Sequence, residues 1–300
     1  MNIIVLGAGA IGSVYGAKLS RGNDVTLVGR AAHAAQINGH GLQITGLEES
    51  VYRLRAVTAL EVMPPDALVL LTTKASDSEA AVRSIAALVR ADTTLLCIQN
   101  GLYVEDIPKS IVGDCCTVLR AITNLGAIYR TPGVVELKAL SSTSIEQSRA
   151  SAAIAETFRA SGLEATVSQR IKDEMWRKLI VNCVINPVNA ITRTEVGAIA
   201  DQRLDPLKRL IVDECVSVAR RDGVEFDEDM VDAINRRYGP SRNLSSMQQD
   251  LLQGRRTEID FLNGAVVRLG ESFGIPCPVN QALTTIIRQM ESAARSATPA

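Results

Sequence analysis

The feature that most constrains the fold of this chain is a glycine-rich turn near its N-terminus. Six residues form the turn: Gly7, Ala8, Gly9, Ala10, Ile11 and Gly12. It follows a short apolar run, residues 3–6, and opens an alanine-rich segment with helical spacing, the context in which G-x-G-x-x-G predicts dinucleotide binding. The alternative is a glycine-rich turn without a ligand. Because spacing and flanks agree, we favour the dinucleotide site and expect all six residues to bind the cofactor.

Short apolar runs alternate with helical patterns along the first half of the chain. The apolar runs are residues 3–6, 25–28, 67–73, 94–98, 118–122, 133–137 and 164–167. Helical patterns cover residues 10–20, 78–89 and 148–161. Buried strands that alternate with helices are typical of a parallel, doubly wound sheet. We therefore predict an α/β Rossmann-type dinucleotide-binding domain, with all of these strands in one sheet.

The second half of the chain has the apolar spacing of helices. Strand patterns stop after Gln169, and proline-containing pairs such as Asn186-Pro187 and Asp205-Pro206 are expected to separate successive helices. The sequence thus predicts two domains. Residues 1–168 would form the Rossmann-like, cofactor-binding domain, and residues 169–300 an all-α domain that carries substrate-binding and catalytic groups.

Charge and hydropathy argue against several classes of partner. The 32 Lys and Arg residues nearly balance 33 Asp and Glu residues, so no global field attracts nucleic acid or an anionic membrane. Apolar stretches fall short of the ~20 residues that a membrane span needs, and the N-terminus lacks a signal-peptide pattern. We expect a cytoplasmic protein with no nucleic-acid or membrane partner, whose apolar helices could supply a homodimer surface.

Cysteine and histidine usage does not support a metal site. The six cysteines contain no C-x-x-C pair, and the two histidines, His33 and His40, both lie in the first forty residues. Neither a disulfide framework nor a zinc site is therefore expected. Because histidine is so scarce, the acid–base group should be another residue type unless one of these two supplies it, and both are interpreted as loop residues rather than ligands.

The residue after the second predicted strand indicates which dinucleotide is bound. An NAD site usually has an acidic residue about 20 positions after the glycines, where it bonds the ribose 2′-hydroxyl. Here residues 25–28 are followed by Gly29 and Arg30. A guanidinium can pair with a 2′-phosphate, so NADPH is favoured over NADH, with Arg30 as a cofactor-binding residue. The alternative for Arg30 is a solvated loop arginine.

Two further polar residues follow predicted strands. Lys74 comes after residues 67–73, and Asn100 comes after the run at residues 94–98, within Gln99-Asn100-Gly101. Open α/β sheets bind ligands outside the carboxyl ends of their strands, so both residues are candidates for the site. Strand-end caps or turn formers are an equally good explanation.

A polar stripe is expected on the first helix of the second half. Lys178, Asn182 and Asn186 recur every four residues, and each step turns about 40° around a helix, so the three share one face. Among apolar neighbours, a lysine and two amides should face a polar cleft, where a desolvated lysine can act as a general acid. The alternative is the solvent-facing stripe of a surface helix.

These features together resemble the ketopantoate reductases (2-dehydropantoate 2-reductases). The resemblance spans nearly the whole chain and rests on seven features in order: residues 7–12, Arg30, Lys74, Gln99-Asn100-Gly101, Trp176-Arg177-Lys178-Leu179 with Asn182 and Asn186-Pro187, residues 243–250, and residues 257–260. It implies NADPH-dependent reduction of a small 2-keto acid, ketopantoate, to (R)-pantoate in pantothenate and coenzyme A biosynthesis.

The resemblance also implies roles for individual residues. Lys178 would be the general acid, and Glu258 would interact with the lysine, the substrate and the cofactor. Substrate-binding roles would fall to Asn100, Asn182, Asn186, Asn243 and Ser246, of which Ser246 would take the substrate carboxylate. Lys74 and Asn100 would lie beside the nicotinamide and its ribose. No metal ion is implied.

Two of these roles rest on the resemblance alone. On one continuous helix, Ser246 and Glu258 would point about 120° apart, so a break at Gly254 or the packing of other helices would have to bring them together. Without the resemblance, Ser246 is better explained as a helix N-cap, with Gln249 three residues later, and Glu258 as a surface acid.

One segment departs from the family pattern and leaves the substrate open. Residues 136–145 contain three serines and no glycine where a glycine-rich stretch is expected. The alternatives are therefore a related NAD(P)H-dependent reductase of another 2-keto acid and a non-catalytic NADP sensor. The lysine and two amides of the polar stripe argue against the sensor, since a sensor needs no proton donor.

Overall fold

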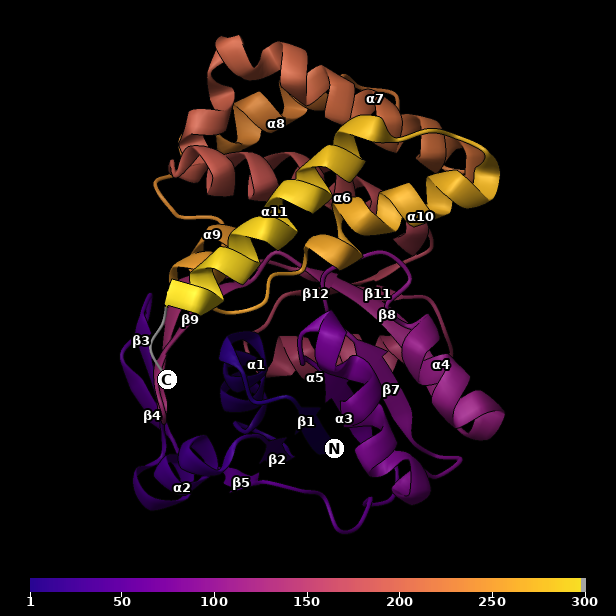
Figure 1. Ribbon diagram of the computed structural model, residues 1–300. Coiled ribbons are helices and arrows are strands. Elements are labelled where there is room, and N and C mark those ends of the chain that lie inside the picture. Colours follow the sequence, from indigo (N-terminus) through magenta and orange to yellow (C-terminus); the bar gives the residue numbers. More distant parts are fainter. Residues whose placement is uncertain (298–300) are drawn as a thin grey trace. The chain divides into compact units, whose positions relative to one another are not determined.

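A computed structural model describes residues 1–297 of the chain, with side chains to residue 294 (Figure 1). The chain divides into two compact units. The first contains Met1–Gln99 and Tyr103–Ile171, and the second contains Asn100–Leu102 and the chain from Lys172 onward. Asn100 therefore belongs to the second unit, although it follows a strand of the first.

The first unit is built on an eight-stranded sheet with the order β12-β11-β8-β7-β6-β1-β2-β5. Its strands are β1 (Asn2–Leu6), β2 (Asp24–Val28), β5 (Arg55–Val57), β6 (Leu68–Leu71), β7 (Thr94–Cys97), β8 (Thr117–Thr123), β11 (Thr143–Glu146) and β12 (Ala165–Ser168). All neighbouring pairs are parallel except β11 and β8. This mostly parallel sheet confirms the predicted α/β class.

Five α-helices accompany the sheet: α1 (Ala10–Leu19), α2 (Ala31–His40), α3 (Ser78–Ile85), α4 (Asp106–Val112) and α5 (Ser151–Ala160). Short 3₁₀ turns η1 (Ala75–Asp77), η2 (Ala86–Leu88) and η3 (Gly113–Cys115) complete the unit. Alternate residues of β1 enter different cores: Ile3 and Val5 pack in the cluster that contains Phe158 of α5, whereas Ile4 packs in the cluster that contains Val82 of α3. The middle of the sheet is thus buried on both faces, which explains the apolar runs of β1, β6 and β7.

One predicted strand lies in a different sheet. Residues 133–137 fall in β10 (Val134–Ala139), which pairs with β3 (Leu42–Gly46) and β9 (Gly126–Thr131) in a four-stranded sheet completed by β4 (Ser50–Tyr52). The prediction that this run extends the large sheet is wrong. A two-residue turn lets β10 fold back on β9 as an antiparallel pair, and an apolar run does not specify its pairing partner.

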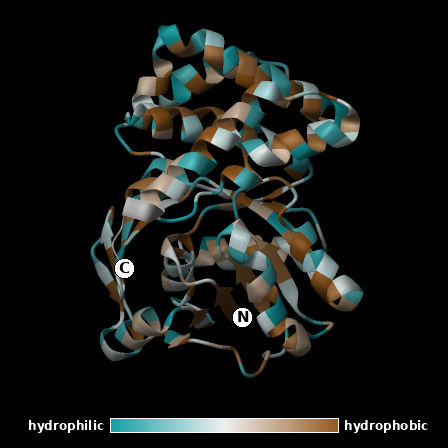
Figure 2. Ribbon diagram, viewed as in Figure 1, coloured by the Kyte–Doolittle hydropathy of each residue, from teal (hydrophilic) through white to brown (hydrophobic). Residues whose placement is uncertain are grey.

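The second unit is helical in the part of the chain that is described. Its α-helices are α6 (Ile171–Thr192), α7 (Asp205–Arg221), α8 (Met230–Tyr238), α9 (Ser246–Leu252), α10 (Asn263–Phe273) and α11 (Pro278–Ala297). Three 3₁₀ turns join them: η4 (Val196–Ala200), η5 (Gln202–Leu204) and η6 (Ile259–Phe261). Apolar and polar residues alternate around these helices (Figure 2), and the predicted all-α character is confirmed. Over residues 1–297, no helix is long and apolar enough to span a bilayer.

The pair Asn186-Pro187 does not separate two helices as predicted. Pro187 lies inside α6, which continues to Thr192. A proline in a helix leaves the carbonyl four residues earlier without its N–H donor. Here that carbonyl belongs to Cys183, and the side-chain amide of Asn263 donates to it over 3.0 Å. A partner distant in sequence therefore supports the continuous helix.

Candidate functional site

The glycine turn of the first unit has the geometry that its sequence predicts. Gly7 has a φ of +109°, and a Cβ at this position would lie 2.5 Å from the backbone nitrogen of Thr73. A Cβ on Gly12 would overlap the carbonyl oxygen of Gly7. Gly9 differs, because, apart from Gly9 itself and its chain neighbours, the described part of the chain places no heavy atom within 4 Å of a Cβ at this position. Gly7 and Gly12 thus close the turn, whereas Gly9 leaves open space at the N-terminus of α1.

Arg30 lies at the end of β2, where it is the exposed N-cap residue of α2. The first turn of this helix contains no acidic residue. Tyr129 of β9 lies close enough to Arg30 for the guanidinium to act on the tyrosine pKa, which burial nevertheless raises. A positively charged, acid-free helix N-terminus is a suitable place for an anionic group.

Both histidines lie in α2, so their interpretation as loop residues is wrong, and His33 is a buried structural residue of this helix. Its Nε2 lies 3.0 Å from Oγ of Ser13 in α1, and its Nδ1 accepts a hydrogen bond from the Gly133 N–H over 2.8 Å. The ring also packs against Tyr129, with centroids 5.0 Å apart. His33 therefore connects the helix after the glycine turn to the β9–β10 turn.

The strand-end residue Lys74 is the N-cap residue of η1. Its carbonyl accepts hydrogen bonds from the Asp77 N–H at 2.9 Å and from Oγ of Ser78 at 3.4 Å. The backbone of Lys74 thus forms the turn after β6, as a strand-end cap would. Its side chain is half-buried and follows the end of β6, so Lys74 remains a candidate for the site.

The end of β7, which leads to Asn100, is fixed by a residue that the sequence patterns did not identify. Arg120 of β8 is 3 % exposed, and its guanidinium donates to the carbonyls of Cys97 at 3.2 Å and Gln99 at 2.7 Å. It also lies 3.7 Å from the carboxylate of Glu105. A charged residue inside the apolar run of residues 118–122 was the available signal, since such a residue must find buried acceptors.

Asn100 and Glu258 are joined within the second unit. The Asn100 side-chain amide donates to Glu258 Oε2 over 3.0 Å, and the Leu102 N–H donates to the Phe261 carbonyl over 3.3 Å. Glu258 precedes η6 and is half-buried, so it is not the ordinary surface acid of the alternative interpretation. The structure therefore brings together two residues that lie 158 positions apart in the sequence.

The polar stripe lies along α6 as expected. Because α6 is one helix, Lys178, Asn182 and Asn186 share a face. Lys178 and Asn182 are half-buried, and Asn186 is buried. Neighbouring Trp176, on another face, is completely buried. The three polar side chains are thus less exposed than those of a solvent-facing surface stripe would be.

Ser246 and Asn243 lie around the start of α9. The N-cap of this helix is Ser245, whose Oγ accepts from the Gln248 N–H at 3.3 Å, so the alternative interpretation of Ser246 as the cap is wrong by one residue. Ser246 is instead the first helical residue and is exposed, as is Asn243. The expected break is present: α9 ends at Leu252, and Gly254 has a φ of +62°.

The segment that contains Asn243 is attached to η4. The Asn243 carbonyl accepts from the Val196 N–H at 2.8 Å, and the Ser241 carbonyl accepts from the Gly197 N–H at 2.9 Å. A Cβ on Gly197 would lie 2.5 Å from the Ser241 carbonyl oxygen, so this close approach requires glycine. The position of Asn243 thus depends on η4.

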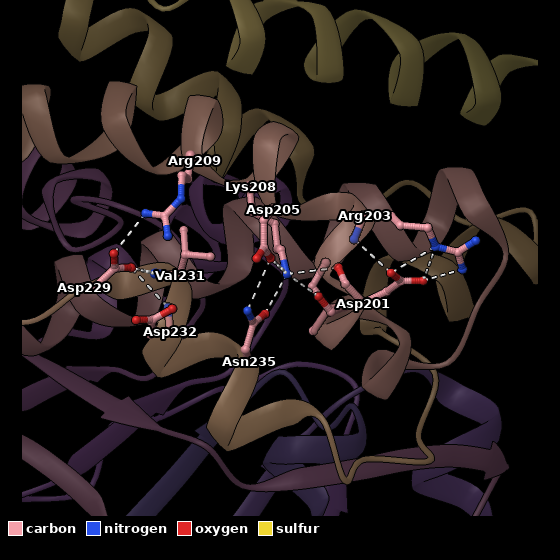
Figure 3. A network of polar contacts seen from close by, with 10 residues as sticks. Asp201, Arg203, Asp205, Lys208, Arg209, Asp229, Val231, Asp232 and Asn235 are labelled. Carbon is pink, nitrogen blue, oxygen red and sulfur yellow. Dashed lines mark hydrogen bonds and ion pairs between the residues drawn. The ribbon is translucent and has the colours of Figure 1, made fainter.

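A buried lysine in turn holds η4 in place (Figure 3). Lys208 of α7 has no exposed surface, and its Nζ donates to the Ile199 carbonyl and to Asn235 Oδ1, both at 2.6 Å, while pairing with Asp205 at 2.5 Å. Lys208 lies on the same helix face as Ile211, three residues later, which is equally buried. A lysine on an apolar helix face was the sequence signal for this support.

Comparisons with known proteins decide the family. A family model described as ketopantoate reductase PanE/ApbA matches residues 3–150, and a model of the C-terminal part of the same proteins matches residues 170–291. The chain belongs to the ketopantoate reductase family. Membership makes it an oxidoreductase and confirms the resemblance seen in its motifs.

Curated relatives within the ketopantoate reductase family match over almost their full length. The 2-dehydropantoate 2-reductase of Pyrococcus horikoshii is 36% identical over 300 residues, covering 97% of this chain and 98% of the relative. The enzyme of the same name from Vibrio cholerae is 35% identical over 299 residues, with 97% and 98% covered.

Solved structures agree with this assignment. A PanE/ApbA family ketopantoate reductase from Ralstonia eutropha has a TM-score of 0.92 at 31% identity, covering 98% of this chain and 100% of that one. A D-mandelate dehydrogenase bound to NADH and anilino(oxo)acetate has a TM-score of 0.90, also at 31% identity, with 98% and 99% covered. Both structures have the fold described above.

Proposed function

We propose that this member of the ketopantoate reductase family reduces a 2-keto acid with NADPH. Ketopantoate is the proposed substrate and (R)-pantoate the product, on the route to pantothenate and coenzyme A. The observation that carries the proposal is the enclosed polar face of α6, where Lys178, Asn182 and Asn186 lie in line. Proton donation beside amide ligands is what carbonyl reduction requires of a protein.

The first unit fits a dinucleotide. Open space over Gly9 allows a pyrophosphate to approach the backbone, and the first N–H groups of α1 have no intrahelical acceptor and can bind its oxygens. Arg30 at the N-terminus of α2 would pair with a 2′-phosphate, because no carboxylate in that turn repels it. When bound, NADPH supplies the hydride that the substrate carbon receives.

Cofactor preference is tested at Arg30. We expect Arg30→Ala to raise KM for NADPH about tenfold and to leave KM for NADH nearly unchanged, because only the 2′-phosphate loses a partner. Steady-state assays with both cofactors measure this ratio. Arg53→Ala, which removes the same charge outside the proposed contacts, is the control. An equal rise for both cofactors would contradict the assignment.

The second unit would supply the acid and the substrate contacts. As the carbonyl carbon gains hydride, Lys178 transfers a proton from Nζ to the carbonyl oxygen, which becomes the hydroxyl of the product. Asn182 and Asn186 would bind that hydroxyl and keep the lysine oriented. Ser246 and Asn243 would bind the substrate, with Ser246 at its carboxylate, and Glu258 would place Asn100 through their hydrogen bond.

A related reductase of another 2-keto acid is the second candidate. It is favoured by the similarity to D-mandelate dehydrogenase, which holds anilino(oxo)acetate, an aromatic relative of a 2-keto acid. The glycine-free segment at residues 136–145 also departs from the ketopantoate reductase pattern. In the structure, this segment comprises the end of β10, the connection after it and most of β11.

Turnover of a substrate panel tests the proposal directly. NADPH oxidation is followed by absorbance with ketopantoate, 2-ketoisovalerate and phenylglyoxylate, first with the unmodified protein. We expect the highest kcat/KM for ketopantoate and a loss of about 10²- to 10⁴-fold in kcat for Lys178→Ala, because a general acid contributes roughly that much. Binding of NADPH, measured by fluorescence titration, should be retained in this variant.

Lys109→Ala is the matched control. Lys109 lies on the exposed side of α4, and its substitution removes the same charge as Lys178→Ala does. Its kcat should equal that of the unmodified protein. Preference for phenylglyoxylate would favour the second candidate. Binding of NADPH without reduction of any of the three keto acids would contradict the proposed substrate and favour a keto acid outside the panel or a non-catalytic NADP sensor.

A further inference from the structure

The helix that carries the proposed proton donor, α6, lacks one of its backbone hydrogen bonds. Pro187 has no N–H, so it cannot donate to the carbonyl of Cys183 as a residue at that position of an α-helix normally does. Cys183 directly follows Asn182 and precedes Asn186 by three residues. The orphaned carbonyl therefore lies in the turn that sets the two proposed substrate-binding amides relative to each other.

Asn263 replaces the missing donor. Its Nδ2 donates to the Cys183 carbonyl over 3.0 Å, across 80 positions of sequence. Both residues are completely buried, so water does not compete for this carbonyl. A buried carbonyl without a partner is costly, and unsatisfied helix carbonyls are sites at which helices bend.

The orientation of the Asn263 amide is set by a chain of hydrogen bonds that begins at the carboxylate of Glu214. Glu214 of α7 accepts from the backbone N–H groups of Val279 at 2.8 Å and Asn280 at 2.9 Å, and from Asn280 Nδ2 at 2.7 Å. An ionised carboxylate accepts and does not donate, so the amide nitrogen of Asn280 must face Glu214. Its Oδ1 then accepts from Asn263 Nδ2 over 2.9 Å. The NH₂ group of Asn263 is thereby directed toward acceptors, including the Cys183 carbonyl.

We propose that Asn263 is a positioning residue: it substitutes for the absent Pro187 N–H and holds the α6 turn that places Asn182 and Asn186 for the substrate. The inference rests on the proposed function, because it assigns that turn to substrate binding. Asn263 touches neither substrate nor cofactor in this proposal. It acts through the Cys183 carbonyl, and Glu214 and Asn280 fix its orientation.

A pair of substitutions tests the replacement of one donor by another. Asn263→Ala removes the amide donor, and Pro187→Ala restores a backbone N–H four residues after Cys183. We expect Asn263→Ala to lower kcat/KM for the keto acid about tenfold, the worth of one hydrogen bond, while KM for NADPH stays unchanged. Pro187→Ala alone should have nearly full activity, and the double variant should recover most of the loss.

Thr284→Val is the matched control for general stabilisation. Thr284 is buried in α11 and its Oγ1 donates to the Asn280 carbonyl over 2.7 Å, so its loss weakens the same unit without removing a donor to Cys183. Pro187→Ala should not rescue this variant. Equal rescue of Thr284→Val, or losses that simply multiply in the Pro187→Ala/Asn263→Ala double variant, would overturn the proposal. Unchanged kcat/KM in a folded Asn263→Ala variant would do the same.

Urea unfolding, followed by the fluorescence of Trp176 on α6, gives a readout that needs no activity. Asn263→Ala should lower the urea midpoint, and the double variant should recover most of that decrease. If Asn263→Ala alone does not fold, the double variant still should, and its failure to fold would overturn the proposal. If the unmodified protein reduces no keto acid while the midpoints show the rescue, the proposed function fails and the replacement of the donor stands.

Discussion

The three glycines of the turn at residues 7–12 differ in what a side chain would meet. Gly9→Ala adds a Cβ that, apart from its chain neighbours, meets no heavy atom of residues 1–297 within 4 Å, so the fold should tolerate it, but the methyl group would occupy the space proposed for the pyrophosphate. We expect the thermal midpoint to change little and the Kd for NADPH to rise at least tenfold. Gly7→Ala should instead destabilise the protein by about 1–3 kcal/mol, because its φ is +109°. Thermal unfolding and fluorescence titration separate the two effects, and similar losses of stability would contradict this distinction.

Individual residues also show where sequence reasoning reaches its limit. The shared face of Lys178, Asn182 and Asn186 follows from the helical period, and the structure has the continuous helix that this requires. The pairing of Asn100 with Glu258 could not be derived in this way, because no periodicity relates residues 158 positions apart. Its position after a strand made Asn100 a candidate, whereas Glu258 was a candidate through the family resemblance alone.

At the scale of elements, the sequence predicted buried strands better than it predicted their partners. Apolar runs identified β1, β2, β6, β7 and β8, because strands buried on both faces lack polar alternation, and they also identified β12, an edge strand with two exposed residues. The run in β10 looked the same but pairs with β3 and β9 in the second sheet. Short strands such as β4 and β5, each of three residues, carry too few apolar positions to form a pattern.

The support of η4 by the buried side chain of Lys208 can be tested by substitution. Lys208→Met keeps most of the length of the side chain but removes its donors to the Ile199 carbonyl and Asn235 and its ion pair with Asp205, which retains the hydrogen bond from the Asn235 amide. The ion pair with Asp205 is buried only on the lysine side, so we expect the free energy of unfolding to fall by about 1–3 kcal/mol, the cost of leaving a buried acceptor such as the Ile199 carbonyl without its donor. Because η4 holds Asn243, KM for the keto acid should also rise.

Arg209→Met is the control for Lys208→Met. Arg209, the next residue of α7, pairs with Asp229 at 2.9 Å on the surface, where such pairs contribute about 0–1 kcal/mol. Urea unfolding monitored by Trp176 fluorescence compares the two variants. Equal losses would show that Lys208 does not support η4 in the way the contacts indicate.

For the whole molecule, the response to acid should occur in two separate ranges of pH. Burial lowers the pKa of His33 below its ordinary value of 6.5, so the unfolded chain binds the proton more readily. Stability from the neutral ring is therefore complete above pH 6.5 and is lost as the pH falls through the lower pKa of the folded state. Ion pairs and hydrogen bonds lower the pKa of carboxyl groups such as Asp201, whose pKa falls to about 2 through its hydrogen bonds with Arg203, and these groups respond only in stronger acid.

Because the sequence contains two histidines, the upper range can be assigned to a single residue. Between pH 7.5 and pH 5.5 we expect the urea midpoint to fall, with a slope of at most about 1.4 kcal/mol in unfolding free energy per pH unit for one proton. His33→Gln should flatten this dependence, since an amide does not titrate, whereas His40→Gln at the exposed end of α2 should leave it unchanged. Protonation of His33 would turn Nδ1 into a donor facing the Gly133 N–H, so the slope reports on the contact between α2 and the β9–β10 turn. If the pH dependence of the unfolding free energy disappeared in His40→Gln but persisted in His33→Gln, the titrating group would be His40, which would contradict the assignment.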